Sequence, residues 1–135
     1  MQIAGFEDLV QAAASQPRPQ RMLFVFMKTV VQKDYTPEQR AAVEADEGGA
    51  LMPQFCVDKT PHEVTNLSAL VREADQQSPD WDKVLVACMD DDAAATSGGE
   101  RATEALKTMI ARVQSGGDLS AYLCFTRSGE PVRFG

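Results

Sequence analysis

The chain is organised around one stretch, Met22-Leu23-Phe24-Val25-Phe26-Met27, which is the longest strongly apolar run in the sequence. The run is short and rich in aromatic side chains, and it carries no polar residue for either face of an extended strand. Such a run is typical of a β-strand that is covered on both faces. It predicts a sheet with helices packed on it, within a single globular domain that spans residues 1–135.

Apolar residues on both sides of this run switch repeatedly between helical and extended spacing. Helical stripes predict helices over residues 6–14, from 37 onward, over 61–74 and over 102–113. Short apolar runs predict further strands at 53–57, 84–89, 121–125 and 131–134. The last two of these strands are joined by a turn at Arg127–Glu130.

Helix start and stop signals support these boundaries. Thr36-Pro37-Glu38-Gln39 and Thr60-Pro61-His62-Glu63 both have the pattern of a capping box with proline at the first helical position. A third capping box is expected at Ser97 to Glu100. The glycine pairs Gly48-Gly49 and Gly116-Gly117 are expected to end the second and the last helix.

The order of the elements predicts the fold class. Strands that alternate with helices favour β-α-β units, so we expect an α/β fold with a mixed, mainly parallel sheet of about five strands. Helices would pack on this sheet, and the last two strands would form a C-terminal antiparallel hairpin. The alternative is an antiparallel α+β sheet with helices on one face.

The charge of the chain excludes some classes of partner. Its 20 acidic and 13 basic side chains give a net charge of −7, and 15 of the acidic residues lie between residues 34 and 100. A field of this sign repels phosphate backbones and anionic lipid surfaces. We therefore expect no nucleic-acid partner and no membrane association, whereas a cation or a basic partner would suit the acidic segment.

The N-terminus and the cysteines indicate the compartment. Residues 1–8 contain neither the basic nor the apolar segment of a secretory signal, so we expect a cytoplasmic protein. Cys56, Cys88 and Cys124 form no Cys-x-x-Cys pair, and each lies within an apolar run. This pattern predicts reduced and largely buried thiols.

Acidic residues follow two of the predicted strands, where ligands bind in an open α/β sheet. Asp58, Lys59 and His62 follow the second strand, and Asp90-Asp91-Asp92 follows the third. If the two strands are adjacent and parallel, these side chains form one ligand site in which Asp58 and Asp90 could hold Mg²⁺ or Mn²⁺. Such a site would suit phosphoryl chemistry. The alternative is an acidic turn whose side chains point in different directions and stay in water.

Three other features could contribute to a site. His62 is the single histidine, and it is either a general base or a solvated side chain at a helix start, with no nucleophile near it in sequence. Gly98-Gly99 could offer amides to an anion, but it belongs to no phosphate-binding motif and follows three aspartates. Arg18 and Arg21 flank the first strand, at the end away from the acidic turns of a parallel sheet, and we expect both to be solvated.

Five segments carry a resemblance to a known family: Arg21–Phe26, Tyr35–Arg40, Glu47–Leu51, Cys56–Lys59 and Arg127–Gly135. Over nearly the whole chain they resemble a family of small proteobacterial proteins that often carry the label "ribonucleotide reductase subunit alpha". The segments consist of caps, turns and strands, so the resemblance implies kinship rather than a reaction.

The label can be compared with the chemistry that it names. A ribonucleotide reductase large subunit resembles a barrel several times the length of this chain, with a thiyl-radical cysteine beside a redox cysteine pair. The three cysteines of this chain are dispersed over separate apolar runs. The ATP-binding cone of those enzymes is nearer in size but basic, whereas this chain is acidic. We therefore expect no reductase catalysis.

The sequence contains no specific catalytic constellation, and it predicts a small cytoplasmic, non-catalytic interaction or accessory module. The alternative function is a small divalent-metal-dependent enzyme or ligand-binding domain that uses the acidic turns. The C-terminal hairpin places Val132 and Phe134 on one apolar face of an edge strand that no later element covers. This arrangement predicts a homodimer through the C-terminal hairpin.

Overall fold

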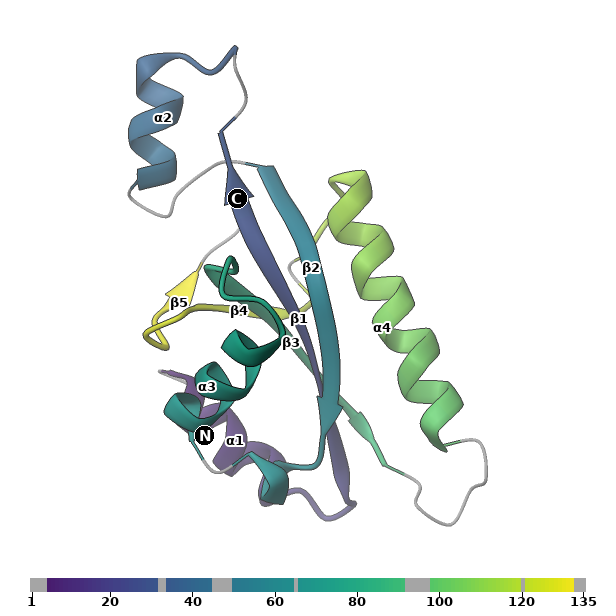
Figure 1. The fold of residues 1–135 in the computed structure, drawn as a ribbon. Helices are drawn as coiled ribbons and strands as arrows, with labels where there is room; N and C mark the ends of the chain where they lie inside the picture. Colours follow the sequence, from purple (N-terminus) through teal and green to yellow (C-terminus); the bar gives the residue numbers. More distant parts are fainter. Residues whose placement is uncertain are drawn as a thin grey trace.

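The computed structural model describes residues 5–31, 34–44, 50–64, 66–91, 98–119 and 121–132 (Figure 1). The elements in these ranges are α1 (Phe6–Ala14), β1 (Gln20–Val30), α2 (Pro37–Glu44), β2 (Ala50–Lys59), the 3-10 helix η1 (Pro61–Glu63), α3 (Leu67–Gln77), β3 (Lys83–Asp90), α4 (Gly98–Ser115), β4 (Leu123–Thr126) and β5 (Pro131–Val132). None of the helices described here has the length and apolar character needed to cross a bilayer.

The strands form one sheet in the order β2-β1-β3-β4-β5, and every neighbouring pair is antiparallel. The predicted mainly parallel α/β sheet is therefore wrong, and the fold is α+β. The predicted number of strands and the C-terminal antiparallel hairpin agree with the structure.

Two connections explain why alternating helices and strands do not produce a parallel sheet here. α2 lies beyond the ends of β1 and β2 rather than over the sheet, so these strands pair as a long hairpin with a helix in its loop (Figure 1). β2 and β3 run in the same direction and are joined through α3, but β1 lies between them and pairs with both. The β-α-β unit exists, and the antiparallel strand inserted in it changes the class of the sheet.

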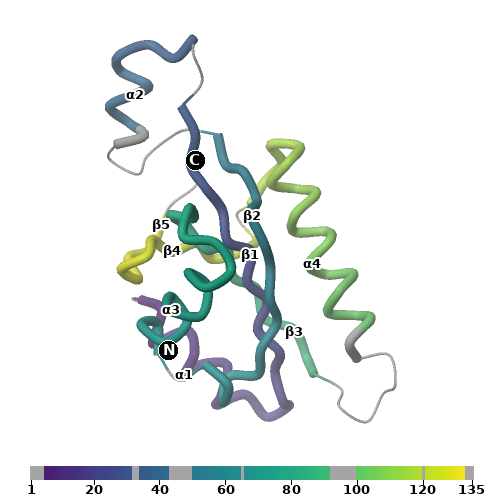
Figure 2. Tube along the Cα trace, in the orientation of Figure 1, coloured from purple at the N-terminus to yellow at the C-terminus, as the bar shows by residue number. Residues whose placement is uncertain are grey.

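Helices cover both faces of the sheet. The alternating side chains of β1 enter two separate cores: Met22, Phe24 and Phe26 pack with α1 and α3, whereas Leu23, Val25 and Met27 pack with α4. All six are buried, which confirms the prediction of a strand covered on both faces. The alternative of an antiparallel α+β sheet is therefore confirmed in its class. Its placement of all helices on one face is wrong, because Figure 2 shows α4 on the side of the sheet opposite to α1 and α3.

Local caps form largely as the sequence predicts. The Thr36 amide donates to Gln39 Oε1 at 2.8 Å, and the Gln39 amide donates to Thr36 Oγ1 at 3.1 Å. The Thr60 amide likewise donates to Glu63 Oε1 at 2.9 Å, but this box encloses only η1. α3 begins later, with Asn66 as its N-cap residue, because Asn66 Oδ1 accepts the Ala69 amide at 2.8 Å.

Glycines end one helix and shape the last hairpin. Gly116 follows α4 at a φ of 70°, as predicted for a helix stop. Gly129 lies in the β4–β5 turn at a φ of 88°, and a Cβ atom there would lie 2.8 Å from Leu67 Cδ2. The turn therefore needs glycine both for its backbone and for its contact with α3. The expected Gly48-Gly49 stop, the Ser97 cap and Phe134 lie outside the described residues.

Candidate functional site

The acidic turns predicted after the second and third strands meet at the end of the sheet where β1 begins, although Asp58, Lys59 and Asp90 are the last residues of β2 and β3 rather than parts of turns. Both strands run antiparallel to β1, and the register pairs Leu23 with Asp58 and Gln20 with Asp90. The structure thus brings Asp58 and Asp91 close together, but from opposite sides of β1 rather than from adjacent parallel strands. Asp92, the third aspartate of the predicted site, lies outside the described residues.

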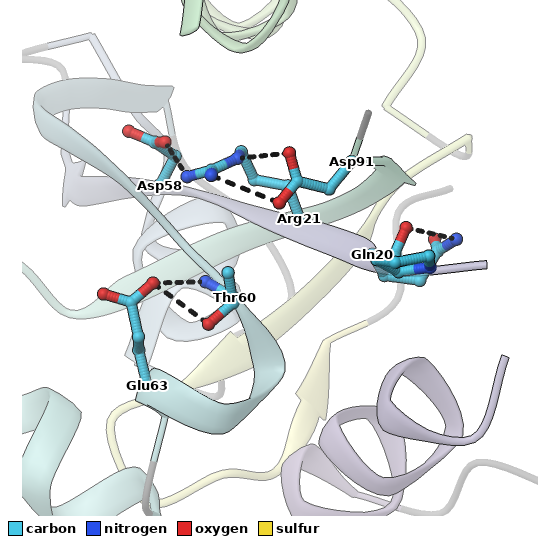
Figure 3. A network of polar contacts seen from close by, with 7 residues as sticks. Gln20, Arg21, Asp58, Thr60, Glu63 and Asp91 are labelled. Carbon is cyan, nitrogen blue, oxygen red and sulfur yellow. Dashed lines mark hydrogen bonds and ion pairs between the residues drawn. The ribbon is translucent and has the colours of Figure 1, made fainter. Parts of the chain in front are cut away.

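Arg21 occupies the space between these two carboxylates (Figure 3). One terminal nitrogen of its guanidinium donates to Asp58 Oδ2 at 2.7 Å, and Nε and the other terminal nitrogen donate to the two oxygens of Asp91 at 3.2 Å each. The hydrogen bond with Asp91, followed by that with Asp58, raises the pKa of Arg21. The position that a divalent cation would take is therefore filled by a cation of the protein itself.

The prediction that Arg21 is solvated is wrong, because that prediction assumed a parallel sheet. In the antiparallel sheet the start of β1 lies beside the ends of β2 and β3, so Arg21 meets the acidic turns. Arg18 is on the same end, where it stays 80 % exposed and lies 3.5 Å from an Asp90 oxygen. The sequence signal that could have located this site is an arginine at the first residues of a central strand.

The other predicted site residues do not converge on Asp58. Side chains alternate along a strand, so Asp90 points to the face opposite to Asp91 and accepts a hydrogen bond from Gln20 Nε2 at 2.7 Å. Lys59 points away from Asp58 and binds Glu73 of α3 at 2.8 Å. His62 is exposed on η1, in the wall of a shallow cavity of about 330 Å³ that Asp91 also borders.

In this cluster the carboxylates of Asp58 and Asp91 are neutralised by their ion pairs with Arg21. Among the described residues, no group of three or more histidine, cysteine, aspartate or glutamate side chains is placed to hold a metal ion. Desolvation raises the pKa of the nearby Cys56 thiol, and the Asp58 carboxylate raises it further. Cys56 is thus a poor source of thiolate, and the arrangement supports a structural role at the end of the sheet.

Two of the three predicted buried cysteines are exposed. Cys124 is buried, whereas Cys56 and Cys88 are exposed, and none of the three forms a disulfide bond. Cys56 lies on β2, which forms one edge of the sheet, and Cys88 lies near the end of β3. The apolar neighbours of each cysteine correctly located strands, but burial depends on what covers each strand, which local sequence does not specify.

A second polar cluster, missed by the sequence analysis, joins α3 to the C-terminal hairpin. Both terminal nitrogens of Arg127 donate to the Asp75 carboxylate, at 2.9 and 2.7 Å, and Trp81 Nε1 donates to Asp75 Oδ1 at 3.0 Å. The guanidinium also lies 4.3 Å from the centre of the buried Trp81 ring. The pKa of Asp75 is lowered, chiefly by its hydrogen bond with Arg127. These contacts fasten the hairpin turn and therefore stabilise the fold.

Lys83 is a buried cation at the opposite end of β3. Its Nζ donates to Thr29 Oγ1 at 2.7 Å and to Asp82 Oδ2 at 3.2 Å, and Asp82 also accepts the Thr29 amide at 2.7 Å. These contacts connect the start of β3 to the end of β1, so they too serve the sheet.

The outer edge of β2 has no partner strand within the described part of the chain. β2 is ten residues long and pairs only with β1. Beside it lies a groove of about 220 Å³ between β2 and α3. The groove is lined by Phe26 of β1, by Phe55, Cys56 and Val57 of β2, and by Leu70, Glu73, Ala74 and Gln77 of α3.

Comparisons of the chain with models of protein families, with curated proteins and with solved structures found no match in any of the three. The site must therefore be interpreted from its own geometry.

Proposed function

We propose that the protein is a small non-catalytic interaction module that binds an extended segment of a partner protein along β2. The observation that carries this proposal is the long unpaired edge of β2 next to a largely apolar groove. An edge strand presents unpaired backbone donors and acceptors, and an added strand satisfies them. Strand addition of this kind is a recurrent mode of peptide recognition, in which side-chain pockets supply specificity.

The second half of β2 lacks the usual protection of an edge strand. The first half contains Pro53, and the pairing register with β1 shifts beside it, so that Gln54 bulges out of the ladder. Past the bulge, Lys59 is the one basic residue, and lysine normally protects an edge by projecting its charge. Here its side chain turns onto α3 and binds Glu73 instead. Residues 55–59 are thus left open to pairing.

The size of the groove favours a side chain over a small-molecule ligand. Its volume of about 220 Å³ lies below the roughly 300–1,000 Å³ of sites that enclose drug-sized ligands. The structure disfavours the metal-dependent alternative, because Arg21 already lies between Asp58 and Asp91. The edge of β2 thus offers a surface for backbone pairing, and the groove beside it has room for one anchoring side chain.

A display library of random extended peptides tests this function. We expect enriched peptides to bind the purified protein and to shift the backbone amide signals of β2 and α3 in NMR spectra. The same peptides with proline at alternate positions should lose binding, because proline cannot donate to a ladder. Enriched peptides that shift only signals far from β2, or a library that yields no binder, would refute the proposal.

The proposal also includes a cytoplasmic location and a homodimer. We place the protein in the cytoplasm, which is supported by the lack of a disulfide bond among Cys56, Cys88 and Cys124, since disulfides are rare there. We also propose the symmetric dimer through the C-terminal hairpin, where β5 forms the second edge of the sheet. Light scattering should then report about twice 14.7 kDa. Kinship with the small proteobacterial family is proposed as well, and it assigns no reaction.

A further inference from the structure

We infer that the segment bound along β2 carries one large apolar side chain, which enters the groove between β2 and α3, and a basic residue two positions away. The inference rests on the proposed function, because it names the chemistry of the partner at the same edge. It follows from the lining of the groove and from the charges at the end of β2.

The floor of the groove is apolar. Phe55 and Val57 are half-buried on the face of β2 that points to α3, and the Phe55 ring stacks on buried Phe26 with 4.6 Å between ring centres. Leu70 and Ala74 of α3 are buried opposite them. A strand added beside β2 would project every second side chain toward α3. The residue that lies beside Val57 would therefore place an apolar side chain over this floor.

The charge that faces solvent at the end of β2 is negative. Glu73 and Asp58 have side chains that are 53 % and 37 % exposed, whereas their cations Lys59 and Arg21 are 14 % and 25 % exposed. The carboxylates are thus the accessible members of both ion pairs. Glu73 lies on the α3 face at the level of Lys59, two residues from Val57, and a basic residue two positions from the apolar anchor would lie beside it.

The β2 edge of a second copy does not supply this chemistry. Lys59 is the single basic residue of β2, and its ammonium group is bound to Glu73. Complementary charge therefore points to a different protein, one that offers an apolar and basic extended segment.

A designed peptide tests this inference directly. The probe is a fluorescent peptide of about nine residues with threonine and valine throughout, a central leucine, and lysines two positions to either side, so that both strand directions present a lysine to Glu73. We expect binding by fluorescence anisotropy, with shifts of the β2 amide signals. A peptide with aspartate in place of leucine should lose binding, and one with glutamates in place of the lysines should bind about tenfold more weakly.

Matched protein variants separate the effect of the charge at Glu73 from the effect of access to the groove. E73K should reverse the preference between the lysine and glutamate peptides, and Q77W should cover the groove and weaken both. Gln76 is exposed on the same helix and does not line the groove, so Q76K and Q76W serve as controls that should bind as the wild type does. Thermal unfolding of all four variants checks that each is folded.

The outcomes of these experiments distinguish a failure of this inference from a failure of the proposed function. If peptides pair with β2 irrespective of the lysine, glutamate and leucine changes, strand addition stands and the proposed partner chemistry is wrong. If no peptide, designed or enriched, shifts the signals of β2, the inferred partner chemistry and the proposed function are both wrong. If light scattering shows that Q77W, but not Q76W, disrupts a complex of the protein with itself, the occupant is a second copy and the inference is overturned.

Discussion

Replacement of Arg21 with methionine should destabilise the protein, because it leaves two carboxylates facing each other. The three hydrogen bonds of Arg21 measure 2.7, 3.2 and 3.2 Å, and the Asp91 side chain is only 9 % exposed. Hydrogen bonds to charged groups contribute about 1.5–3 kcal/mol, and breaking a fully buried pair costs about 3–5 kcal/mol. Arg21 and Asp58 are partly solvated, so we expect a loss near the lower figure, about 1.5–3 kcal/mol. For a chain of this length, that loss lowers Tm by about 5–10 °C.

Urea denaturation and thermal unfolding at pH 7 measure the effect, with R18M as the matched control. Arg18 is exposed and makes one long contact, so its replacement should cost less than about 0.5 kcal/mol. Adding D91N to R21M should recover part of the lost stability, since it removes one of the opposed charges. Millimolar Ca²⁺ or Mg²⁺ should stabilise R21M more than the wild type. Equal stability of R21M and R18M would refute the argument that Arg21 neutralises the acidic turns.

Three further predictions follow from burial and from charge. Because its hydrogen bond with an arginine lowers the pKa of Asp75, that contribution to stability is present above about pH 4 and is lost as the pH falls. D75N should therefore lose less stability than the wild type between pH 7 and pH 3 in urea denaturation, and an equal loss would contradict this. L70A should cost about 2–5 kcal/mol because Leu70 is buried, whereas I110A should cost less because Ile110 is partly exposed; equal losses would be inconsistent with the packing. A thiol reagent should label Cys56 in the native protein, faster as the pH rises because the thiolate is the reactive form, and should leave Cys124 unlabelled. Because the pKa of the Cys56 thiol is raised, its labelling near pH 7 should be slower than that of an unperturbed thiol.

The acidic residues at the ends of β2 and β3 show which parts of a site can be predicted from local sequence. The sequence identified Asp58 and the aspartates after the third strand, since acidic residues directly after apolar runs are visible in the sequence. It included Asp91 in the ligand site but chose Asp58 and Asp90 as the metal ligands, whereas the structure brings Asp58 together with Asp91. The difference arises because the direction of β1 between the two strands decides which cation and which side chains meet there.

Elements of this protein were predictable from sequence where short-range physics decides them. The stripe Phe6, Leu9 and Ala13 defines α1, the apolar run of β1 is buried on both faces, and Gly116 ends α4. Spacing, caps and backbone preferences act over a few residues, so a single stretch of sequence contains the information.

Strand order and direction were decided by the tertiary structure. The position of β1 between β2 and β3 makes the sheet antiparallel, carries Arg21 to the acidic turns and leaves β2 with an open edge beside α3. Each of these facts depends on which strands are neighbours, and residues that become neighbours lie tens of positions apart. Periodicity within one strand is the same whether its partner runs parallel or antiparallel, so only the packing of the whole chain selects between them.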